Sequence, residues 1–376
     1  MTDIFVFGTL RHLPLLEIVL GRSWEGTPQE AVLLDHRCLC VANEIYPALR
    51  NEVGATAKGL LLANLTATEI ERLNFYEGPF DYALTSASVR VGDEIKTAQV
   101  YKPQSPLQVI DVEWSLNDWA QAHSSVTEIA AKDVMAMFGR QSLEQLGRRM
   151  EAIRARASSA LRAGNSSSTA GDPRFLPGQG DVEIVQRTTP HAGFFTVEEV
   201  ALRHRTFDGG LSPAIHREAF VAVDVVTVLP FDPVRNRVLL VEQFRVGPLV
   251  RGDTNPWSLE AVAGRIDAGE TPEEAAFREA REEANLDIRK LVPLSPCYTT
   301  PGAVTEYLYP FIGITDLPDG CAGLGGAQDE GEDIRAHLIE MDEFRAFISN
   351  GVLENSPLIL SGLWLLLNHQ QLTSIP

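Results

Sequence analysis

One stretch of acidic residues constrains the fold of this chain more than any other. Residues 264–286 read GRIDAGETPEEAAFREAREEANL and contain six glutamates against three arginines. Glu279 precedes Glu282 by three positions and Glu283 by four, so a helix would place these carboxylates on one face. Like charges at that spacing destabilise a bare helix by roughly 0.2–0.5 kcal/mol per pair. The stretch is therefore either a solvated acidic helix or a helix that binds a hard divalent cation through oxygen ligands.

Six residues of this stretch follow the pattern G-x5-E-x7-R-E-x-x-E-E, and they are Gly264, Glu270, Arg278, Glu279, Glu282 and Glu283. The spacing resembles the box of the Nudix hydrolases, which cleave nucleoside diphosphates linked to another moiety. The resemblance implies a loop–helix–loop in which Glu279 and Glu283 bind the metals. It also implies that Arg278 pairs with Glu270 and orients the catalytic helix. Asn285 replaces a usual glycine, and asparagine is the next-best residue for a left-handed helix end.

The composition excludes several classes of partner. A formal net charge of −19 disfavours binding to long nucleic acid, because phosphate neutralisation needs clustered Lys and Arg. The first residues do not resemble a signal peptide, and the longest mostly apolar run, 357–367, is too short to span a bilayer. The four cysteines form no C-x-x-C pair, so we expect neither a zinc site nor a disulfide framework. The 376 residues suffice for two domains, and we predict a cytoplasmic protein without a membrane partner.

The N-terminal part, residues 1–125, has the pattern of an α+β domain. Thr66 is followed three residues later by Glu69, which is the capping-box pattern of a helix start. Short apolar runs bounded by turn residues indicate strands that would close around a small cavity. These runs are 4–7, 31–34, 57–62, 83–91 and 97–101.

Three segments of this part resemble the γ-glutamylcyclotransferase-like family, and in chain order they are Phe7–Leu10, Tyr46–Leu49 and Leu73–Tyr82. The resemblance implies a β-barrel domain in which Gly8, Thr9 and Leu10 bind the substrate. It assigns the role of general acid and base to Glu77, whose pKa would be raised by burial beside aromatic residues. Phe7 stands where the family has tyrosine, so one hydroxyl is lost. The alternative is that Glu77 is a solvated turn residue.

The chain changes character in the middle. Residues 126–175 predict a helical connector that ends in the polar linker 164–172, GNSSSTAGD. Residues 176–376 alternate strand and helix patterns around the acidic box, and the Nudix resemblance implies an α/β/α sandwich there. We therefore predict three regions: a γ-glutamylcyclotransferase-like domain over 1–125, the connector, and a Nudix domain over 176–376.

A second acidic cluster, residues 324–334, reads LGGAQDEGEDI. Glycines beside paired carboxylates suit a mobile loop that closes over a metal, although a solvated acidic turn is the alternative. Residues 330–335 match a Glu-x-Glu-Asp-Ile-Arg motif of the ADP-ribose pyrophosphatase branch of the Nudix family. This resemblance assigns activation of the attacking water to Glu330 and metal binding or support to Glu332. We count Glu282 of the box with Glu330 as a catalytic residue.

Further segments resemble the same branch, and they are Arg217–Glu218, Glu242–Arg245, Pro256–Trp257 and Thr300–Gly302 followed by Glu306. The resemblance places the carbonyl of Ala263 among the metal ligands and assigns substrate binding to Arg217, Arg245 and Glu306. A guanidinium fork matches phosphate oxygens, so Arg245 would bind the diphosphate. The alternative for Arg245 is a surface arginine at the end of a strand.

These observations predict Mg²⁺-dependent hydrolysis of ADP-ribose to AMP and ribose 5-phosphate, with Mn²⁺ as an alternative cofactor. The metals would neutralise the diphosphate and position the water. One rival is hydrolysis of another nucleoside diphosphate sugar, because nothing in the sequence reads the base. A second is a sensor that binds ADP-ribose without cleaving it, and the complete set of glutamates disfavours this. A third is γ-glutamyl cyclotransferase activity in the N-terminal half with a regulatory Nudix half.

The Nudix half is predicted to form a homodimer. The final helix, near 357–371, is rich in leucine and would be either a dimer contact or a contact with the rest of its own chain. The family resemblance implies exchange of the strands near 181–202 across a two-fold axis, with Phe207 or Arg217 reaching the partner's nucleotide. The two-domain arrangement also resembles bacterial proteins associated with tellurite resistance, which is a phenotype without a stated chemistry.

Overall fold

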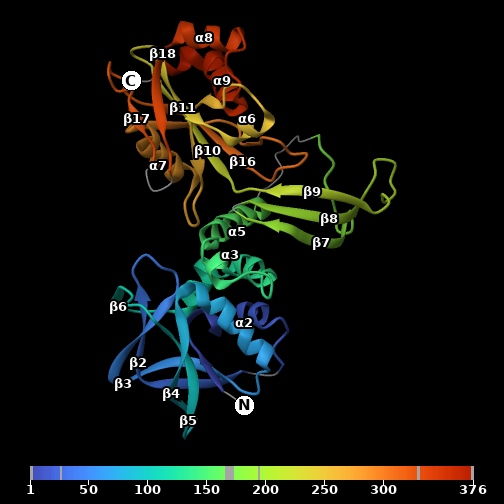
Figure 1. Cartoon of the computed structure of the whole chain (residues 1–376), viewed down its shortest axis with the longest axis vertical. Coiled ribbons are helices and arrows are strands. Elements are labelled where there is room, and N and C mark those ends of the chain that lie inside the picture. The colour runs from blue at the N-terminus through green and yellow to red at the C-terminus, as the bar shows by residue number, and fades with distance from the viewer. Residues whose placement is uncertain (1–2, 26–27, 166–172, 194, 328–330, 374–376) are drawn as a thin grey trace. The chain divides into compact units, whose positions relative to one another are not determined.

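The computed structural model describes residues 3–25, 28–165, 173–193, 195–327 and 331–373 (Figure 1). The chain divides into two compact units, Met1–Ser167 and Ser168–Pro376, and each is described by itself. The division lies inside the range 126–175 that the sequence analysis assigns to a connector.

The N-terminal unit is a closed barrel. Its five barrel strands pair in the ring β3-β1-β5-β4-β2 and back to β3, and β6 adds to β2. The β1–β5 pair is parallel and the other pairs of the ring are antiparallel. Closure leaves no free edge in the ring, and the predicted β-barrel is confirmed. The strands are β1 (Ile4–Val6), β2 (Gln29–Val41), β3 (Pro47–Leu62), β4 (Tyr82–Val91), β5 (Glu94–Pro103) and β6 (Val109–Glu113).

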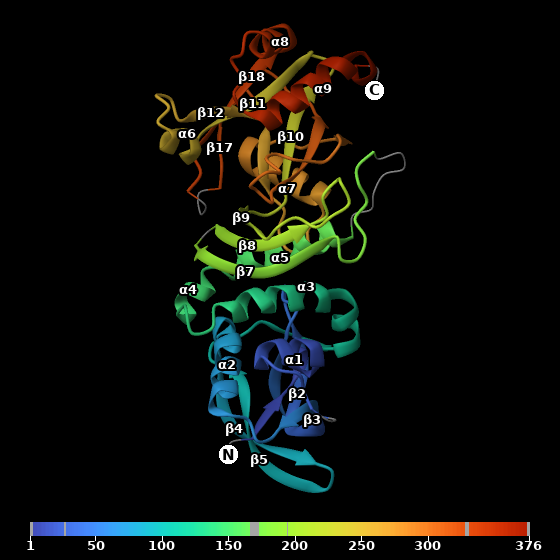
Figure 2. The ribbon, with the colours of Figure 1, turned by 90° about the vertical axis from the view of Figure 1, so that its right-hand side faces the viewer.

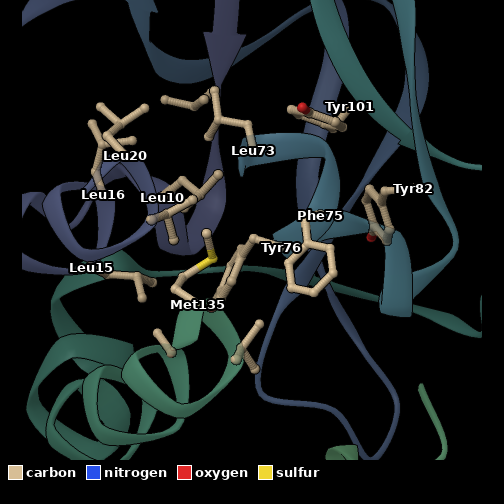
Figure 3. Packing of buried hydrophobic residues seen from close by; sticks show 14 of the residues in the cluster. Leu10, Leu15, Leu16, Leu20, Leu73, Phe75, Tyr76, Tyr82, Tyr101 and Met135 are labelled. Carbon is tan, nitrogen blue, oxygen red and sulfur yellow. The ribbon is translucent and has the colours of Figure 1, made fainter. Parts of the chain in front are cut away.

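Helices pack against this barrel and extend its core. Figure 3 shows leucines of α1, aromatic residues of α2 and Met135 of α3 converging on one cluster. Thr66 and Glu69 form the expected capping box at the start of α2. The helices are α1 (Leu13–Leu20), α2 (Ala67–Glu77), α3 (Leu116–Ala136), α4 (Leu143–Gly147) and α5 (Met150–Gly164), with the short 3₁₀ helices η1 (Gly8–Arg11) and η2 (Gly78–Phe80).

The helices beyond residue 125 belong to this core. α3 runs continuously across residue 125, and Met135, Leu146 and Ile153 are buried in the same cluster as the helices of the barrel domain. The sequence analysis assigns these residues to a connector because the apolar spacing of a helix does not say which core it packs against. A fragment that ends at residue 125 would cut α3 and expose its buried face.

The C-terminal unit is an α/β/α sandwich, as predicted. The sheet has the order β14-β16-β10-β11-β18-β17, with β12 and β13 pairing with β11 and β10, and β15 with β16. Val226 and Val228 of β10 face the helix α7, whereas Leu229 and Phe231 face α8 and α9. The strands are β10 (Val225–Asp232), β11 (Arg237–Phe244), β12 (Trp257–Glu260), β13 (Val262–Arg265), β14 (Lys290–Pro293), β15 (Cys297–Tyr298), β16 (Tyr307–Ile314), β17 (Leu324–Gly325) and β18 (Ile334–Glu340).

Helices cover both faces of this sheet. Figures 1 and 2 show α7 on one side of β10 and β11, and α8 with α9 on the other. The helices are α6 (Val246–Arg251), α7 (Pro272–Ala284), α8 (Met341–Ser349) and α9 (Ser356–Leu372). Among the described residues, no helix is long and apolar enough to cross a membrane.

A separate three-stranded antiparallel sheet precedes the sandwich. Its order is β7-β8-β9, and it meets the sandwich where Phe220 bridges to Val304. Almost all of β7 is exposed, which is unusual for a strand with apolar residues on it. The strands are β7 (Val182–Ala192), β8 (Thr196–His204) and β9 (Ile215–Val221).

Candidate active sites

The helix α7 has defined ends that hold its carboxylates in place. Thr271 accepts a hydrogen bond from the N–H of Glu274, whose carboxylate accepts one from the N–H of Thr271. The helix ends at Asn285 in the left-handed conformation, with φ of 52°, so asparagine does serve where a glycine is usual. Its buried face is made of small side chains, namely Ala275, Ala276, Ala280 and Ala284. These alanines let the helix approach the sheet closely.

Arg278 connects this helix to the loop before it. Its Nε and Nη2 donate to the two carboxylate oxygens of Glu270, each at 2.9 Å, which is the predicted pair. Nη2 also donates to the carbonyl of Arg265 at 3.0 Å. Nη1 donates to Glu279 at 2.6 Å and to Glu282 at 3.1 Å. One guanidinium thus satisfies three carboxylates and one carbonyl, which needs the fork of an arginine.

Two carboxylates of α7 are buried against the sheet. A Cβ atom at Gly264 would overlap the carboxylate of Glu279, so only glycine leaves room for it. Burial raises the pKa of Glu279 to about 7, with Arg278 opposing the shift and Glu282 and Glu332 adding to it. A bound cation would favour the ionised form of Glu279 and so offset the effect of burial.

Glu283 lies deeper than Glu279. Its Oε2 accepts a hydrogen bond from the N–H of Ala263 at 3.0 Å, and its Oε1 lies 3.4 Å from Nε2 of Gln243. Burial raises its pKa to about 8, the Ala263 bond lowers it, and the charges of Glu279 and Glu332 raise it further. Glu332, which lies outside α7, thus acts on the pKa of both Glu279 and Glu283.

The donor set around Gly264 suits a hard divalent cation. Glu279, Glu283, Glu332 and the carbonyl of Ala263 are oxygen donors, which Mg²⁺ prefers. Within the described ranges, no three His, Cys, Asp or Glu side chains stand together as a ready metal cluster. Instead, Glu279 contacts Arg278, and Glu283 contacts the backbone of β13. These oxygen donors fit the chemistry of the ion, and the carboxylate of Glu279 occupies the space that Gly264 leaves.

The second acidic segment is attached to the end of α7. A Cβ at Gly325 would overlap the carbonyl oxygen of Glu283, and the N–H of Gly326 donates to the carbonyl of Glu282 at 3.0 Å. Glu332 accepts a hydrogen bond from the N–H of Ala327 at 3.0 Å. These contacts bring Glu332 to the glutamates of the helix. Residues 328–330 lie outside the described residues, and the role predicted for Glu330 therefore stays a prediction.

Of the three predicted substrate-binding residues in this unit, one lies beside the glutamates. Arg245 interacts electrostatically with Glu283 and Glu332 and makes a two-pronged bond to Glu260, at 3.0 and 2.7 Å. Glu306 accepts a hydrogen bond from Thr299 at 3.1 Å.

Arg217 does not join this group within one chain. It is exposed on β9 and donates to the carbonyl of its neighbour His216. The sequence analysis gave no role to Gln243 and Glu260, which contact Glu283 and Arg245. Pairing of β11 with β12 places Glu260 opposite Val241, on the strand beside the one that leads to Arg245, so no local pattern in the sequence indicates the Arg245–Glu260 pair.

The three N-terminal segments that carry the family resemblance also come together. Gly8 has a left-handed backbone, with φ of 58°, and a Cβ there would lie 2.5 Å from Cγ of Pro47. The hydroxyl of Tyr82 donates to the carbonyl of Pro47 at 3.1 Å, and the rings of Tyr46 and Phe80 are 5.2 Å apart. The predicted Gly8, Thr9 and Leu10 form η1 at this junction.

Glu77 ends α2 beside these aromatic residues (Figure 3 shows Tyr76, Tyr82 and Tyr101). Burial raises its pKa to about 7. Its charge contributes to the raised pKa of each of the three tyrosines, so its carboxylate lies near all of them. Within the described part of the chain Glu77 has no hydrogen bond or ion pair. Glu77 is partly buried beside these tyrosines, and its role as general acid and base stays a prediction.

Comparisons with known proteins match both units. The NUDIX domain model matches residues 221–355, and the model "Gamma-glutamyl cyclotransferase, AIG2-like" matches residues 4–121. The ADP-ribose pyrophosphatase of Escherichia coli (strain K12) is 38% identical over 203 residues, which are 53% of this chain and 96% of that protein. The one from Haemophilus influenzae is 33% identical over 52% of this chain and 90% of its own length. The GDP-mannose pyrophosphatase of Pectobacterium atrosepticum is 29% identical over 48% and 91%.

The overlap between Gly264 and Glu279 predicts a specific defect. Gly264→Ala should push the carboxylate of Glu279 out of its position and weaken Mn²⁺ binding by roughly tenfold or more, because one charged oxygen donor is lost. Calorimetric titration of the full chain with Mn²⁺ measures this. Gly323→Ala is the control, since no atom lies within 4 Å of the Cβ it would add. Equal Mn²⁺ affinity in the two variants would contradict the assignment of Glu279 as a ligand.

Proposed function

The chain belongs to the NUDIX family, and from that premise we propose that it hydrolyses ADP-ribose to AMP and ribose 5-phosphate with Mg²⁺, or with Mn²⁺ in its place. The observation that carries this proposal is the group of buried carboxylates around Gly264 with Arg245 beside them. The higher identity to proteins named ADP-ribose pyrophosphatase, 38% and 33% against 29%, favours ADP-ribose over GDP-mannose.

Each residue then has a defined task. A bound divalent cation would neutralise the diphosphate and make its phosphorus open to attack by water. Glu279, Glu283, Glu332 and the Ala263 carbonyl would hold it. Arg245 would turn its fork from Glu260 to the diphosphate, because two oxygens of one phosphate can accept the two N–H groups that a carboxylate accepts.

The remaining groups act on the water and on the geometry. We assign the proton of the attacking water to Glu330, because the resemblance to the ADP-ribose pyrophosphatase branch gives this role to the first glutamate of the motif at 330–335. Glu282, half-exposed and bonded to Arg278, supports this arrangement. Glu306 would bind the sugar side of the substrate. The complete set of carboxylates disfavours the sensor alternative, and a cytoplasmic location and a link to tellurite resistance stay predictions.

The substrate proposal is tested with a panel. Purified protein with Mg²⁺ should release AMP from ADP-ribose faster than it cleaves GDP-mannose or UDP-glucose, as measured by phosphate released after phosphatase treatment.

Glu283→Gln should lower turnover by at least roughly two orders of magnitude, because the ligand charge is lost while the side chain keeps its shape. Glu273→Gln, on the exposed first turn of the same helix, is the matched control. Equal rates in the two variants would make Glu283 a structural residue.

We also propose that the C-terminal unit forms a homodimer through its three-stranded sheet. Several apolar side chains of this sheet and its loops are exposed, and they are Val182, Ile184, Val185, Phe195, Phe207, Leu211 and Phe220. An uncovered sheet with that much apolar surface fits an interface. A two-fold axis there would also bring Arg217 of β9 toward the partner's substrate.

The final helix contributes less to this surface than its leucines predict. Leu358, Leu365 and Leu372 are buried against the sheet of their own unit. Only the stripe of Leu360, Leu363 and Leu367 is exposed. The predicted contact through α9 is thus in part an ordinary core contact.

The dimer proposal is tested by light scattering. The full chain should have twice the mass of one chain, and Ile184→Glu should lower the association because it buries a charge at the interface. Ile95→Glu places the same charge on an exposed position of the N-terminal barrel and should leave the mass unchanged. A parent protein that is a monomer with full activity at nanomolar concentration would remove the proposal.

A second candidate function belongs to the N-terminal unit. The raised pKa of Glu77, near 7, suits proton exchange at neutral pH. We propose that Glu77 takes a proton from the α-ammonium group of a γ-glutamyl compound. The freed amine nitrogen attacks the γ-carbonyl carbon and loses a second proton as the amide bond to the leaving amine breaks. The leaving nitrogen receives both protons, the first of them from Glu77, and departs as the protonated amine. The products are 5-oxoproline and a free amine.

This second function has a characteristic pH dependence. The ionised form of Glu77 accepts the proton, so kcat/KM for release of 5-oxoproline should rise as pH increases through about 7. Glu77→Gln should lower the rate by roughly a hundredfold or more and abolish that rise. Glu71→Gln, on the exposed side of the same helix, should leave both unchanged. No release by the parent protein from γ-glutamyl dipeptides would reject the activity.

A further inference from the structure

Two helices outside the AIG2-like match contact the Glu77 site. The match ends at residue 121, whereas α4 and α5 begin at Leu143 and Met150. A Cβ at Gly78, the residue after Glu77, would lie 2.7 Å from Cδ2 of Leu143. The helix α4 therefore packs directly on the turn that follows the candidate acid/base. Ile153 anchors α5 in the same core.

Arg154 extends from α5 to the aromatic residues of this site. Its guanidinium carbon is 5.8 Å from the ring centroid of Phe80, within the range of a cation–π contact. Phe80 in turn contacts Tyr46 at 5.2 Å and Tyr76 at 6.0 Å between centroids. Burial raises the pKa of both tyrosines, and the charge of Arg154 opposes the rise in each. The cation thus faces the same aromatic group that surrounds Glu77.

Within the described residues, the guanidinium of Arg154 has one acidic side chain in ion-pair range, Glu44, and this pair is loose. Nη1 of Arg154 lies 3.9 Å from Oε2 of Glu44, and about a third of each side chain is exposed. That separation is too long for a hydrogen bond, and partly exposed pairs of this kind contribute little to stability. A carboxylate that enters the site can therefore replace Glu44 at little energetic loss.

The site needs a cation if its ligand is an anion. The charges of Glu77 and Glu44 would disfavour a carboxylate, and both raise the pKa of Tyr82. A guanidinium offers two parallel N–H donors that match a carboxylate, and the Phe80 ring limits its orientation. Arg154 is thus placed to compensate the charge of such a ligand.

We propose that Arg154 is a specificity-determining residue of the N-terminal site and binds the α-carboxylate of a γ-glutamyl ligand. This assignment rests on the N-terminal function proposed above. It means that the helices after the barrel, which the family match does not include, complete the ligand site. If Arg154 only held α5 to the barrel through Glu44, the ligand's carboxylate would not matter to it.

The test compares binding and turnover in the full chain. With γ-L-glutamyl-L-alanine as substrate, Arg154→Gln should raise KM about tenfold or more while kcat changes less than about twofold, because the lost contact is with the bound carboxylate. Arg154→Lys should recover part of the loss. Arg148→Gln is the control, since Arg148 is exposed at the end of α4, shortly before α5, and pairs with Glu144. A fall in kcat alone, or equal KM in Arg154→Gln and Arg148→Gln, would overturn the assignment.

A binding experiment separates this assignment from the activity itself. L-glutamine and 4-aminobutanamide differ only in the α-carboxylate, and calorimetry measures their affinity for the parent and for Arg154→Gln. We expect the parent to prefer glutamine by about tenfold or more and the variant to lose that preference. If Arg154→Gln loses the preference but the parent protein forms no 5-oxoproline, only the catalytic proposal fails. If the parent has no preference, or the variant keeps it, Arg154 does not read the carboxylate.

Discussion

The arrangement of the C-terminal site depends on the partly buried guanidinium of Arg278. Arg278 binds both oxygens of Glu270, the carbonyl of Arg265, and single oxygens of Glu279 and Glu282. Without it, several carboxylates would be left close together in a partly desolvated place, and each uncompensated charge there is expensive. Lysine has three donors at one point and could not satisfy this geometry. The loop before α7 and the helix itself therefore keep their relative position through a single side chain.

Both sites also require segments to approach one another more closely than a Cβ atom would allow, and glycine meets this requirement in both units. Gly264 leaves space for the carboxylate of Glu279, and Gly325 lets the acidic loop touch the carbonyl of Glu283. In the barrel unit, Gly8 lies against Pro47 and Gly78 against Leu143. In each case the glycine joins segments that are distant in sequence, so a side chain there would separate the parts of a site.

The sequence predicts local features of this protein better than distant contacts. The spacing of the acidic box predicts α7, its left-handed end at Asn285 and the pair of Arg278 with Glu270, because all three depend on residues within one or two helical turns. The α/β/α sandwich and the barrel follow from the family resemblances and from alternating apolar runs.

The extents of the elements and several partners are harder to predict. β2 and β3 run over Gln29–Val41 and Pro47–Leu62, far beyond the apolar runs, because pairing within the ring stabilises polar residues at their ends. α3 crosses residue 125 because its partners are on α1 and α2. Gln243, Glu260 and Arg154 reach their sites only through strand pairing or helix packing, which no local pattern encodes.

Both units hold glutamates whose pKa burial raises toward neutrality, but their neighbours differ. Glu279 raises the pKa of Glu283, and Glu332 raises the pKa of both, so a bound cation would relieve the repulsion among these carboxylates. Glu77 has no carboxylate among the causes of its shift and no hydrogen-bond partner in the described residues. It can therefore gain and lose a proton without moving other charges. The same direction of pKa shift thus supports the proposed metal ligands in one unit and the proposed proton carrier in the other, and only the surrounding groups distinguish them.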